Sequence, residues 1–255
     1  MNSRRLYRNW IAADGLVSYT VTIDSTDLHV RTDRDLRSEA LASAATHRHS
    51  VQDYIRTHPR FATSLEPQPA DNDAPGLVRE MATAARIAGV GPMAAVAGAI
   101  AEAVGRDLLQ YSDEVVVENG GDVFIATRVG RTVGLYAGQS ILTGRIGLTI
   151  QPEDCPLGIC TSSGTFGHSL SLGGADSCTV IARSAAVADA LATALCNRIR
   201  RASDLADVLD PSGMPAEALG VLAVVEGQVG MHGAIRLVPL DVAPPAADTG
   251  RHGLP

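Results

Sequence analysis

The beginning of the chain alternates between apolar and polar positions and then changes to a helical spacing. In residues 16–23 one set of alternate positions carries Val17, Tyr19, Val21 and Ile23, and the other set is mostly polar. This period of two predicts a strand, and residues 28–31 predict a second strand that pairs with it across the polar turn 24–27. From 36 to 57 the apolar residues recur at helical spacing, which predicts a helix that ends at Pro59.

Two more helices are predicted on either side of a glycine-rich turn. Residues 66–76 contain three prolines and several acidic or amide side chains, so they predict a loop and the best position for an internal linker. A strongly helical stretch covers 77–88 and ends at Gly89. After the turn 89–92, a second helix rich in Ala and Gly is predicted over 93–109.

The second half of the chain predicts mainly strands. They cover residues 114–118, 123–127, 132–137, 146–150, 177–182, 219–225 and 229–237. Residues 151–167 predict an irregular stretch, and 185–200 predict a helix capped by Ser184. Three prolines in residues 242–255 predict a flexible tail.

Composition and charge narrow the class of protein. Apolar residues make up 45% of the chain and aromatic residues only 4%, so the core must consist of Ala, Val, Leu and Ile. The net charge of -7 argues against a nucleic-acid partner, because nucleic-acid binders normally carry a basic patch. The longest apolar run, 90–104, is interrupted by Glu102 and is too short for a membrane span. No signal-peptide core follows the basic start, so we expect a cytoplasmic protein with no membrane segment. The spacings of the four cysteines match no zinc pattern.

Gly91 belongs to the first of three glycine-rich clusters that could carry chemistry. It precedes the helix predicted at 93–109, and exposed amides at the start of a helix attract phosphate or carboxylate groups. The sequence is neither a Walker A nor a dinucleotide-binding motif, so a tight turn at the start of the helix explains it equally well.

The second cluster is the hairpin tip from Glu118 to Asp122. A plain two-residue turn needs only Asn-Gly or Asp-Gly, whereas here Asn119, Gly120 and Gly121 lie between two carboxylates. The sequence allows two interpretations of this cluster. One is a ligand contact through Asn119, Gly120, Gly121 and Asp122, and the other is a solvated hairpin tip.

The third cluster, residues 158–169, combines a thiol, five hydroxyls, three glycines and a histidine. A loop of this composition offers hydrogen-bond donors to an anion through Thr161, Ser162, Ser163 and Gly164. His168 titrates near neutrality, which makes it the candidate general acid or base.

Asp189 and Thr193 form the fourth candidate feature. They are four residues apart and hence on one face of the helix predicted at 185–200, where their neighbours are apolar. Two hard oxygen ligands on such a face suit Mg²⁺, with a backbone carbonyl, water and phosphate oxygens completing the coordination. The alternative is an Asp that favours the helix dipole and a Thr bonded back to a carbonyl of the same helix.

Taken in this order, the clusters resemble the UPF0280 family (also called DUF375), a branch of the ApbE-like superfamily. The resemblance extends from Tyr7 to about Asn197. It rests on His58-Pro59-Arg60-Phe61 and on the stretches 89–98, 116–122, 158–172 and 188–194.

The resemblance implies a chemistry and a set of ligands. Characterised members of the superfamily are FAD:protein FMN transferases, which cleave FAD with Mg²⁺, attach FMN to a hydroxyl of a target protein and release AMP. Their metal is held by an Asp and a Thr four residues later and by an alanine carbonyl, which match Asp189, Thr193 and Ala94 here. Their Thr-Ser-Gly stretch ahead of a histidine is similar to Ser162-Ser163-Gly164 and His168.

The chain also departs from the transferases. They continue after the histidine with Asp-Pro-x-Thr-Gly, whereas Ser169 and Leu170 follow His168 here, and Ala95 replaces the lysine of their glycine turn. The residues that match the metal ligands are retained, whereas the departures affect the part of the site that binds flavin and the target protein in the transferases.

We therefore expect an α+β protein of the ApbE-like fold, with mixed, mostly antiparallel sheets and Ala-rich helices in one domain over 1–255. Its expected function is a Mg²⁺-dependent action on, or binding of, a flavin or nucleotide diphosphate. FAD is the candidate cofactor, and FMN transfer to a protein acceptor is one form of that activity. A non-catalytic protein that binds flavin or another small anion is the alternative, and acyl transfer by Cys160 and His168 is a third and weaker one.

Overall fold

The chain opens with a β-hairpin, as the alternating pattern predicts. The computed structural model describes residues 15–138, 140–165 and 173–240. Strand β1 (Val17–Ile23) pairs antiparallel with β2 (Thr26–Thr32), which is longer than predicted because residues 26, 27 and 32 also join the ladder. The aromatic and apolar side chains of Tyr19 and Val21 are buried, whereas the polar residues between them are exposed.

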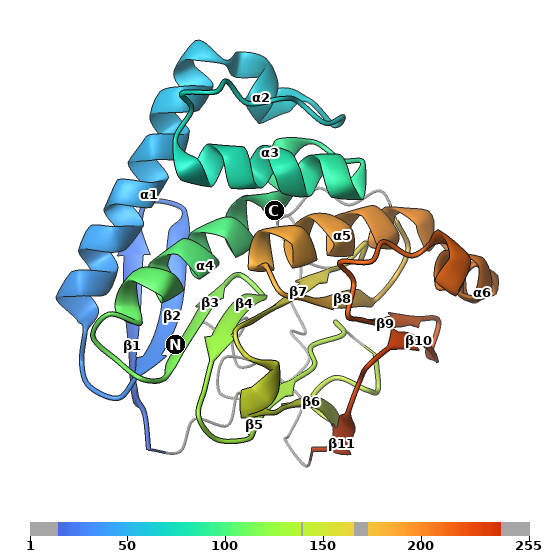
Figure 1. Cartoon of the computed structure of the whole chain (residues 1–255). Coiled ribbons are helices and arrows are strands. Elements are labelled where there is room, and N and C mark those ends of the chain that lie inside the picture. Colours follow the sequence, from blue (N-terminus) through green and yellow to red (C-terminus); the bar gives the residue numbers. More distant parts are fainter. Residues whose placement is uncertain (1–14, 139, 166–172, 241–255) are drawn as a thin grey trace, which may run out of the picture.

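An eight-stranded antiparallel sheet forms the centre of the molecule (Figure 1). Its strand order is β1-β2-β3-β4-β7-β8-β9-β10, and every neighbouring pair is antiparallel. Beyond the first hairpin it consists of β3 (Val115–Asn119), β4 (Asp122–Ala126), β7 (Leu157–Ser162), β8 (Ser177–Ala182), β9 (Gly220–Val225) and β10 (Gln228–Gly233).

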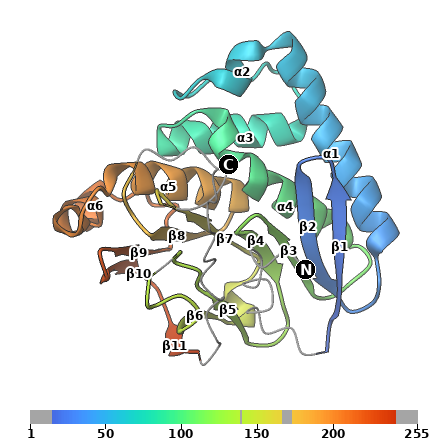
Figure 2. The ribbon, with the colours of Figure 1, turned by 180° about the vertical axis from the view of Figure 1, so that it is seen from behind.

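One face of this sheet is covered by helices (Figures 1 and 2). Helix α4 (Val96–Leu108) packs on β3 and β4, and α5 (Ala185–Arg198) packs on β7 and β8. Helix α3 (Gly76–Ala88) packs against α5, and α1 (Arg37–Thr57) packs against α4 and β1. The buried face of α5 consists largely of alanine and that of α4 is rich in alanine and glycine, so both helices approach the sheet closely.

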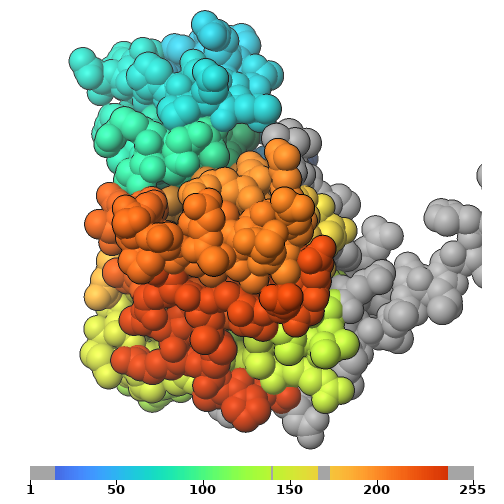
Figure 3. Space-filling model, turned by 90° about the vertical axis from the view of Figure 1, so that its right-hand side faces the viewer, coloured from blue at the N-terminus to red at the C-terminus, as the bar shows by residue number. Residues whose placement is uncertain are grey.

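The other face is covered by a small sheet of β5 (Arg131–Gly134), β6 (Ile146–Ile150) and β11 (Leu237–Pro239). A second apolar core lies between the two sheets, and it includes Val116, Ile125, Leu148, Ile159 and Leu222. Figure 3 shows the layers from the side, with the helices above and the strands of the C-terminal half below. This layered arrangement confirms the predicted mixed α+β class.

Three stretches differ from the sequence prediction. The strand expected over 229–237 ends at Gly233 as β10, and Leu237–Pro239 forms β11 in the other sheet. Residues 157–162 were expected to be irregular but form β7, a buried central strand between β4 and β8. Glycine, cysteine and hydroxyl residues hide its alternation, and pairing with two neighbouring strands stabilises it. The helix expected over 93–109 is divided into a 3₁₀ turn, η2 (Pro92–Ala95), and α4, with a break at Ala95.

Short elements and an irregular loop complete the described chain. Helix α2 (Pro59–Thr63) follows α1 directly, and residues 64–75 form the loop that the prolines predict between α2 and α3. Helix α6 (Leu205–Val208) follows α5 after the 3₁₀ turn η4 (Ala202–Asp204). The tail predicted at 242–255 lies outside the described residues.

In the described part of the chain, no single helix has the length and apolar character needed to cross a membrane. Within the same residues, one pair of helices is long and apolar enough for a membrane span when its two members are counted together. The pair consists of Gly76–Ala88 and Pro92–Leu108, and it is bent by 104° at the break between them.

Candidate functional site

The first turns of α4 and α5 meet on the helix-covered face of the sheet. The Asp189 carboxylate on α5 accepts a hydrogen bond from the Gly98 amide of α4, with 2.9 Å between Oδ2 and N. The Glu102 carboxylate on α4 accepts one from the Ala185 amide of α5, with 2.6 Å between Oε2 and N. Because the first amides of a helix have no partner within it, each helix is capped by a carboxylate of the other.

Gly98 allows this close crossing. A Cβ atom at this position would lie 2.2 Å from the Ala185 carbonyl oxygen and 2.8 Å from the Asp189 Cβ. The glycine is therefore required by the approach of the α5 backbone. This explains one of the small residues that the sequence shows only as a general enrichment in α4.

The break at Ala95 changes the hydrogen bonding at the start of α4. In a continuous helix the Gly98 amide would donate to the carbonyl of Ala94, four residues earlier. Here that amide donates to Asp189, and Ala95 has φ −111° and ψ 0°. The Ala94 carbonyl is thus released from its helical bond, and the η2 turn that carries it packs against α5.

A second carboxylate, Asp122 at the start of β4, lies in the same place. It is 8% exposed, and the Thr161 amide donates to its Oδ1 at 3.3 Å. Loss of hydration and the nearby Asp189 charge raise the pKa of Asp122 well above its ordinary value. Burial likewise raises the pKa of Asp189 to about 7, although the amides of Gly98 and Ala97 oppose this shift.

Among the described residues, no arginine is paired with either of these two carboxylates. All 21 basic residues of the chain, apart from histidines, are arginines, and within the described residues none forms an ion pair with Asp122 or Asp189. Two buried acidic groups with no cationic partner among the described side chains favour either a shared proton or a bound cation.

The β3–β4 hairpin brings the second glycine cluster to the start of α4. The Asn119 side-chain amide donates to the Ala97 carbonyl at 3.0 Å, and the Gly121 amide donates to Glu118 at 2.8 Å. Gly120 and Gly121 have φ values of +68° and +112°, which only glycine adopts readily at both positions of a two-residue turn. The hairpin therefore supplies both the turn and a polar contact to α4.

Strand β7 places the first part of the third cluster on two different faces of the sheet. Cys160 faces α5, and its thiol donates to the Ala185 carbonyl at 3.3 Å. Thr161 faces the other side, where its hydroxyl is 2.8 Å from the Thr179 hydroxyl. This part of the cluster is a strand and not the expected loop, so neighbouring side chains point in opposite directions. That its donors contact an anion stays a prediction.

Burial also affects the thiol and hydroxyl chemistry of β7. Loss of hydration raises the pKa of Cys160 well above its ordinary value, and the charges of Asp122 and Asp189 raise it further. A nucleophilic thiolate needs the opposite environment, which disfavours the acyl-transfer alternative. The Ser162 hydroxyl is buried and has no hydrogen-bond partner among the residues that the structure describes.

The other predicted site residues have different surroundings. The Ser163 hydroxyl accepts from the Thr165 amide at 3.2 Å, and the Gly164 amide donates to Ala175, so these two residues form a local turn beyond β7. Gly91 is buried, and a Cβ there would overlap the Ser64 carbonyl, so packing accounts for this glycine. Thr193 lies one turn after Asp189 on α5 and is partly exposed.

His168 lies outside the described residues, so its predicted place in the site stays a prediction. The structure brings together Asp122, Asp189, Asn119 and the η2 turn with Ala94 at the start of α4. Their ligand roles, like those of Gly91, Gly120, Gly121, Thr161, Ser162, Ser163, Gly164 and Thr193, also stay predictions.

Sequence reasoning missed Glu102. It is 1% exposed, and its only signal is an acidic residue within a helix that is otherwise Ala- and Gly-rich. That signal indicates a buried carboxylate with a fixed partner, because an unpaired buried charge is costly.

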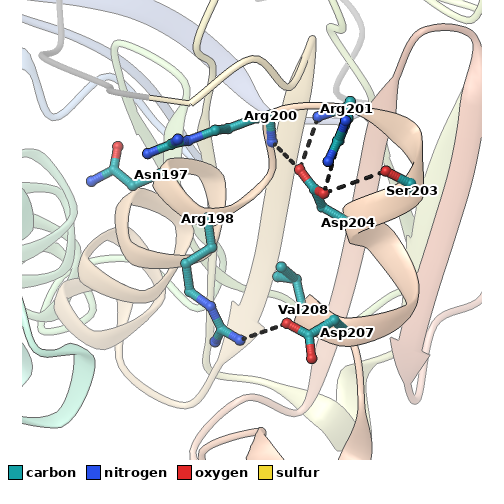
Figure 4. A pocket seen from close by; sticks show the side chains of 8 residues that line it. All are labelled: Asn197, Arg198, Arg200, Arg201, Ser203, Asp204, Asp207 and Val208. Carbon is teal, nitrogen blue, oxygen red and sulfur yellow. Dashed lines mark hydrogen bonds and ion pairs between the residues drawn. The ribbon is translucent and has the colours of Figure 1, made fainter.

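A separate hollow of about 760 Å³ lies at the other end of α5 (Figure 4). Its polar walls include Arg198, Arg200 and Arg201, but Arg198 faces Asp207 at 3.9 Å and Arg201 faces Asp204 at 3.5 Å. Two of the three arginines are therefore already paired. No group of three or more His, Cys, Asp or Glu residues arranged for a metal ion occurs among the described residues.

Comparison with known proteins agrees with this architecture. A family model described as AbpE bacteria matches residues 8–224. A UPF0280 protein of Methanocaldococcus jannaschii is 42% identical over 190 residues, which cover 72% of this chain and 77% of the relative. The chain belongs to the UPF0280 family. Another UPF0280 protein, from Methanothermobacter thermautotrophicus, is 40% identical over 228 residues, covering 87% of this chain and 88% of the relative.

Solved structures identify the fold of this UPF0280 protein as ApbE-like. The apo flavinyl transferase ApbE of Pseudomonas stutzeri matches with a TM-score of 0.57 and 12% identity, over 89% of this chain and 94% of the transferase. The ApbE protein of Thermotoga maritima matches with a TM-score of 0.54 and 14% identity, over 87% and 96%. The resemblance that the motifs predict is thereby confirmed for family and fold.

Proposed function

We propose that this UPF0280 protein binds Mg²⁺ at the crossing of α4 and α5 and uses it to bind or cleave a flavin or nucleotide diphosphate. One observation carries the proposal: the Gly98 amide donates to Asp189 instead of to Ala94, four residues earlier, and the η2 turn that contains Ala94 packs against α5 at this break in the helix. A carboxylate and a backbone carbonyl are the ligands that Mg²⁺ prefers.

The residues present fit a divalent cation. Asp189 and Ala94 provide two hard oxygens, and Thr193 provides a third one turn along α5. Asp122 adds a second negative charge close to Asp189, and a cation would relieve their mutual repulsion. Bound Mg²⁺ would supply charge neutralisation for a diphosphate, whose phosphate oxygens complete its coordination.

The polar residues at the tip of the β3–β4 hairpin and at the end of β7 are the candidates for binding the ligand. We assign Asn119 to Asp122 and Thr161 to Gly164 to the diphosphate or flavin ligand, and His168 to the proton transfer that cleavage requires. FAD is the proposed flavin, because flavinyl transfer is the activity named for the Pseudomonas stutzeri protein of the same fold. A hydroxyl-bearing protein would be the acceptor of FMN.

Binding without turnover is the second candidate. It is favoured by the sequence after His168, which lacks the Asp-Pro segment of the transferases, and by the 4% aromatic content, because aromatic rings commonly stack on flavins. In that case the site would hold an anionic small molecule, and no AMP would be released.

Metal and ligand binding are tested by titrating Mg²⁺ into the protein with and without ADP, following heat release and Tm. A ligand that binds only the folded state raises Tm. Asp189→Ala should remove most of this rise, whereas Asp107→Asn, which removes a surface carboxylate at the end of α4, should leave it unchanged. Equal responses of both variants would refute the metal assignment.

Turnover is tested with FAD, Mg²⁺ and a threonine-containing acceptor peptide. AMP release together with an FMN mass increase on the peptide would establish the transferase, and His168→Ala should abolish both signals. Saturable FAD binding without AMP would establish the binding protein instead. Failure to bind FAD or any nucleotide would refute the proposed function.

A further inference from the structure

The crossing of α4 and α5 is held by a buried carboxylate that the proposed chemistry does not use. Glu102 Oε2 accepts hydrogen bonds from the Ala185 amide at 2.6 Å and from the Ser184 hydroxyl at 2.8 Å. Its other oxygen, Oε1, is paired with the Arg106 guanidinium. With 1% of its surface exposed, Glu102 binds the start of α5 and has no access to a ligand in solvent.

Glu102 and Asp189 are linked through both helices. Glu102 is four residues after Gly98 on α4, and Asp189 is four residues after Ala185 on α5. Four residues are about one helical turn, or roughly 6 Å along the axis. Two hydrogen bonds therefore join one turn of α4 to one turn of α5: Glu102 binds Ala185, and Asp189 binds Gly98.

We propose that Glu102 is a positioning residue for the metal and diphosphate site. It fixes the first turn of α5 against α4, and this places the Asp189 carboxylate at the Gly98 amide, on the helix against which the η2 turn with Ala94 packs. Without Glu102 the first α5 amides lose a buried charged acceptor and the helix end is free to shift or fray. The effect of Glu102 on metal binding rests on the proposed function, whereas its effect on the position of Asp189 does not.

Three variants separate positioning from general stability. Glu102→Ala removes the acceptor, and Glu102→Gln keeps an oxygen that can accept from the Ala185 amide. Leu108→Ala is the matched destabilised control, because it removes a fully buried side chain from the other end of α4. Each variant is studied as the full chain below its unfolding temperature.

Two measurements are made on each variant. The first is the Kd of Mg²⁺ in the presence of ADP, which we expect to rise about tenfold or more in Glu102→Ala, as is usual when a group that orients a metal ligand is lost. Glu102→Gln should recover most of this affinity, and Leu108→Ala should leave it unchanged. The second is hydrogen exchange at the Gly98 amide without metal, relative to the Val117 amide of β3.

The exchange measurement decides the placement even if the protein binds no metal. Glu102→Ala should accelerate exchange at Gly98 about tenfold or more relative to Val117, because Asp189 no longer holds that amide. Unchanged protection of Gly98 would overturn the inference, as would an equal loss of Mg²⁺ affinity in Leu108→Ala. If the wild type fails to bind Mg²⁺–ADP while Gly98 still loses protection in Glu102→Ala, the proposed function fails and the placement by Glu102 stands.

Discussion

Substituting Gly98 by alanine tests the geometry of the helix crossing directly. The added methyl group would lie 2.2 Å from the Ala185 carbonyl oxygen and 2.8 Å from the Asp189 Cβ. These atoms belong to the first two turns of α5, whose first amides are bound by Glu102 and Ser184, so they cannot move aside as the end of a flexible side chain would.

Two effects of opposite sign determine the magnitude. Alanine is favoured over glycine within a helix by about 1 kcal/mol. Overpacking of a filled interior costs about 1–3 kcal/mol, and contact with backbone atoms lies at or above the upper end of that range. We therefore expect a net loss of about 2 kcal/mol, which for a chain of this size lowers Tm by roughly 4–8 °C.

The assay is chemical and thermal unfolding of Gly98→Ala beside Gly76→Ala. Gly76 begins α3, and a Cβ there meets no atom within 4 Å, so this control carries the same substitution without the overlap. Its stability should equal or exceed that of the wild type. A Gly98→Ala protein as stable as Gly76→Ala would refute the close crossing of α4 and α5.

Three further predictions concern the carboxylates, a buried ion pair and the thiols. The folded-state pKa of Asp189, about 7, lies above the ordinary value of 3.8, so the folded protein binds this proton more tightly and loses stability as pH rises from about 4 to 7. Urea unfolding across this range should show a smaller loss for Asp189→Asn, and parallel curves would contradict the assignment. Arg131→Ala should lower the free energy of unfolding by about 1–3 kcal/mol, because the buried Arg131 side chain forms an ion pair at 2.8 Å with the partly buried Glu114. A loss below about 1 kcal/mol in a denaturation curve would show that the pair contributes little. Iodoacetamide should label half-buried Cys155 before Cys160, Cys178 and Cys196, which are fully buried, and rapid labelling of native Cys160 in a mass spectrum would contradict its burial.

Local sequence patterns predict most elements of this fold. The alternation in residues 17–23 and the two glycines after Asn119 specify hairpins, because strand faces and turn conformations depend on neighbouring residues. Gly89 ends α3 in the left-handed conformation, with φ +72°, for the same local reason. The four-residue spacing of Asp189 and Thr193 likewise places both side chains on one face of α5 before any tertiary structure is known.

The tertiary structure alone decided how the site is assembled. Strand β7 has no clear alternation and exists because β4 and β8 pair with it on both sides. The helix predicted over 93–109 breaks at Ala95 because the Gly98 amide finds its acceptor in Asp189, 91 residues along the chain. Glu102 is buried because its partners are the first amides of α5, 83 and 84 residues away. Periodicity and capping motifs describe bonds between near neighbours, whereas a buried amide or carboxylate takes whichever partner the packed helices bring to it, and that partner depends on the whole fold.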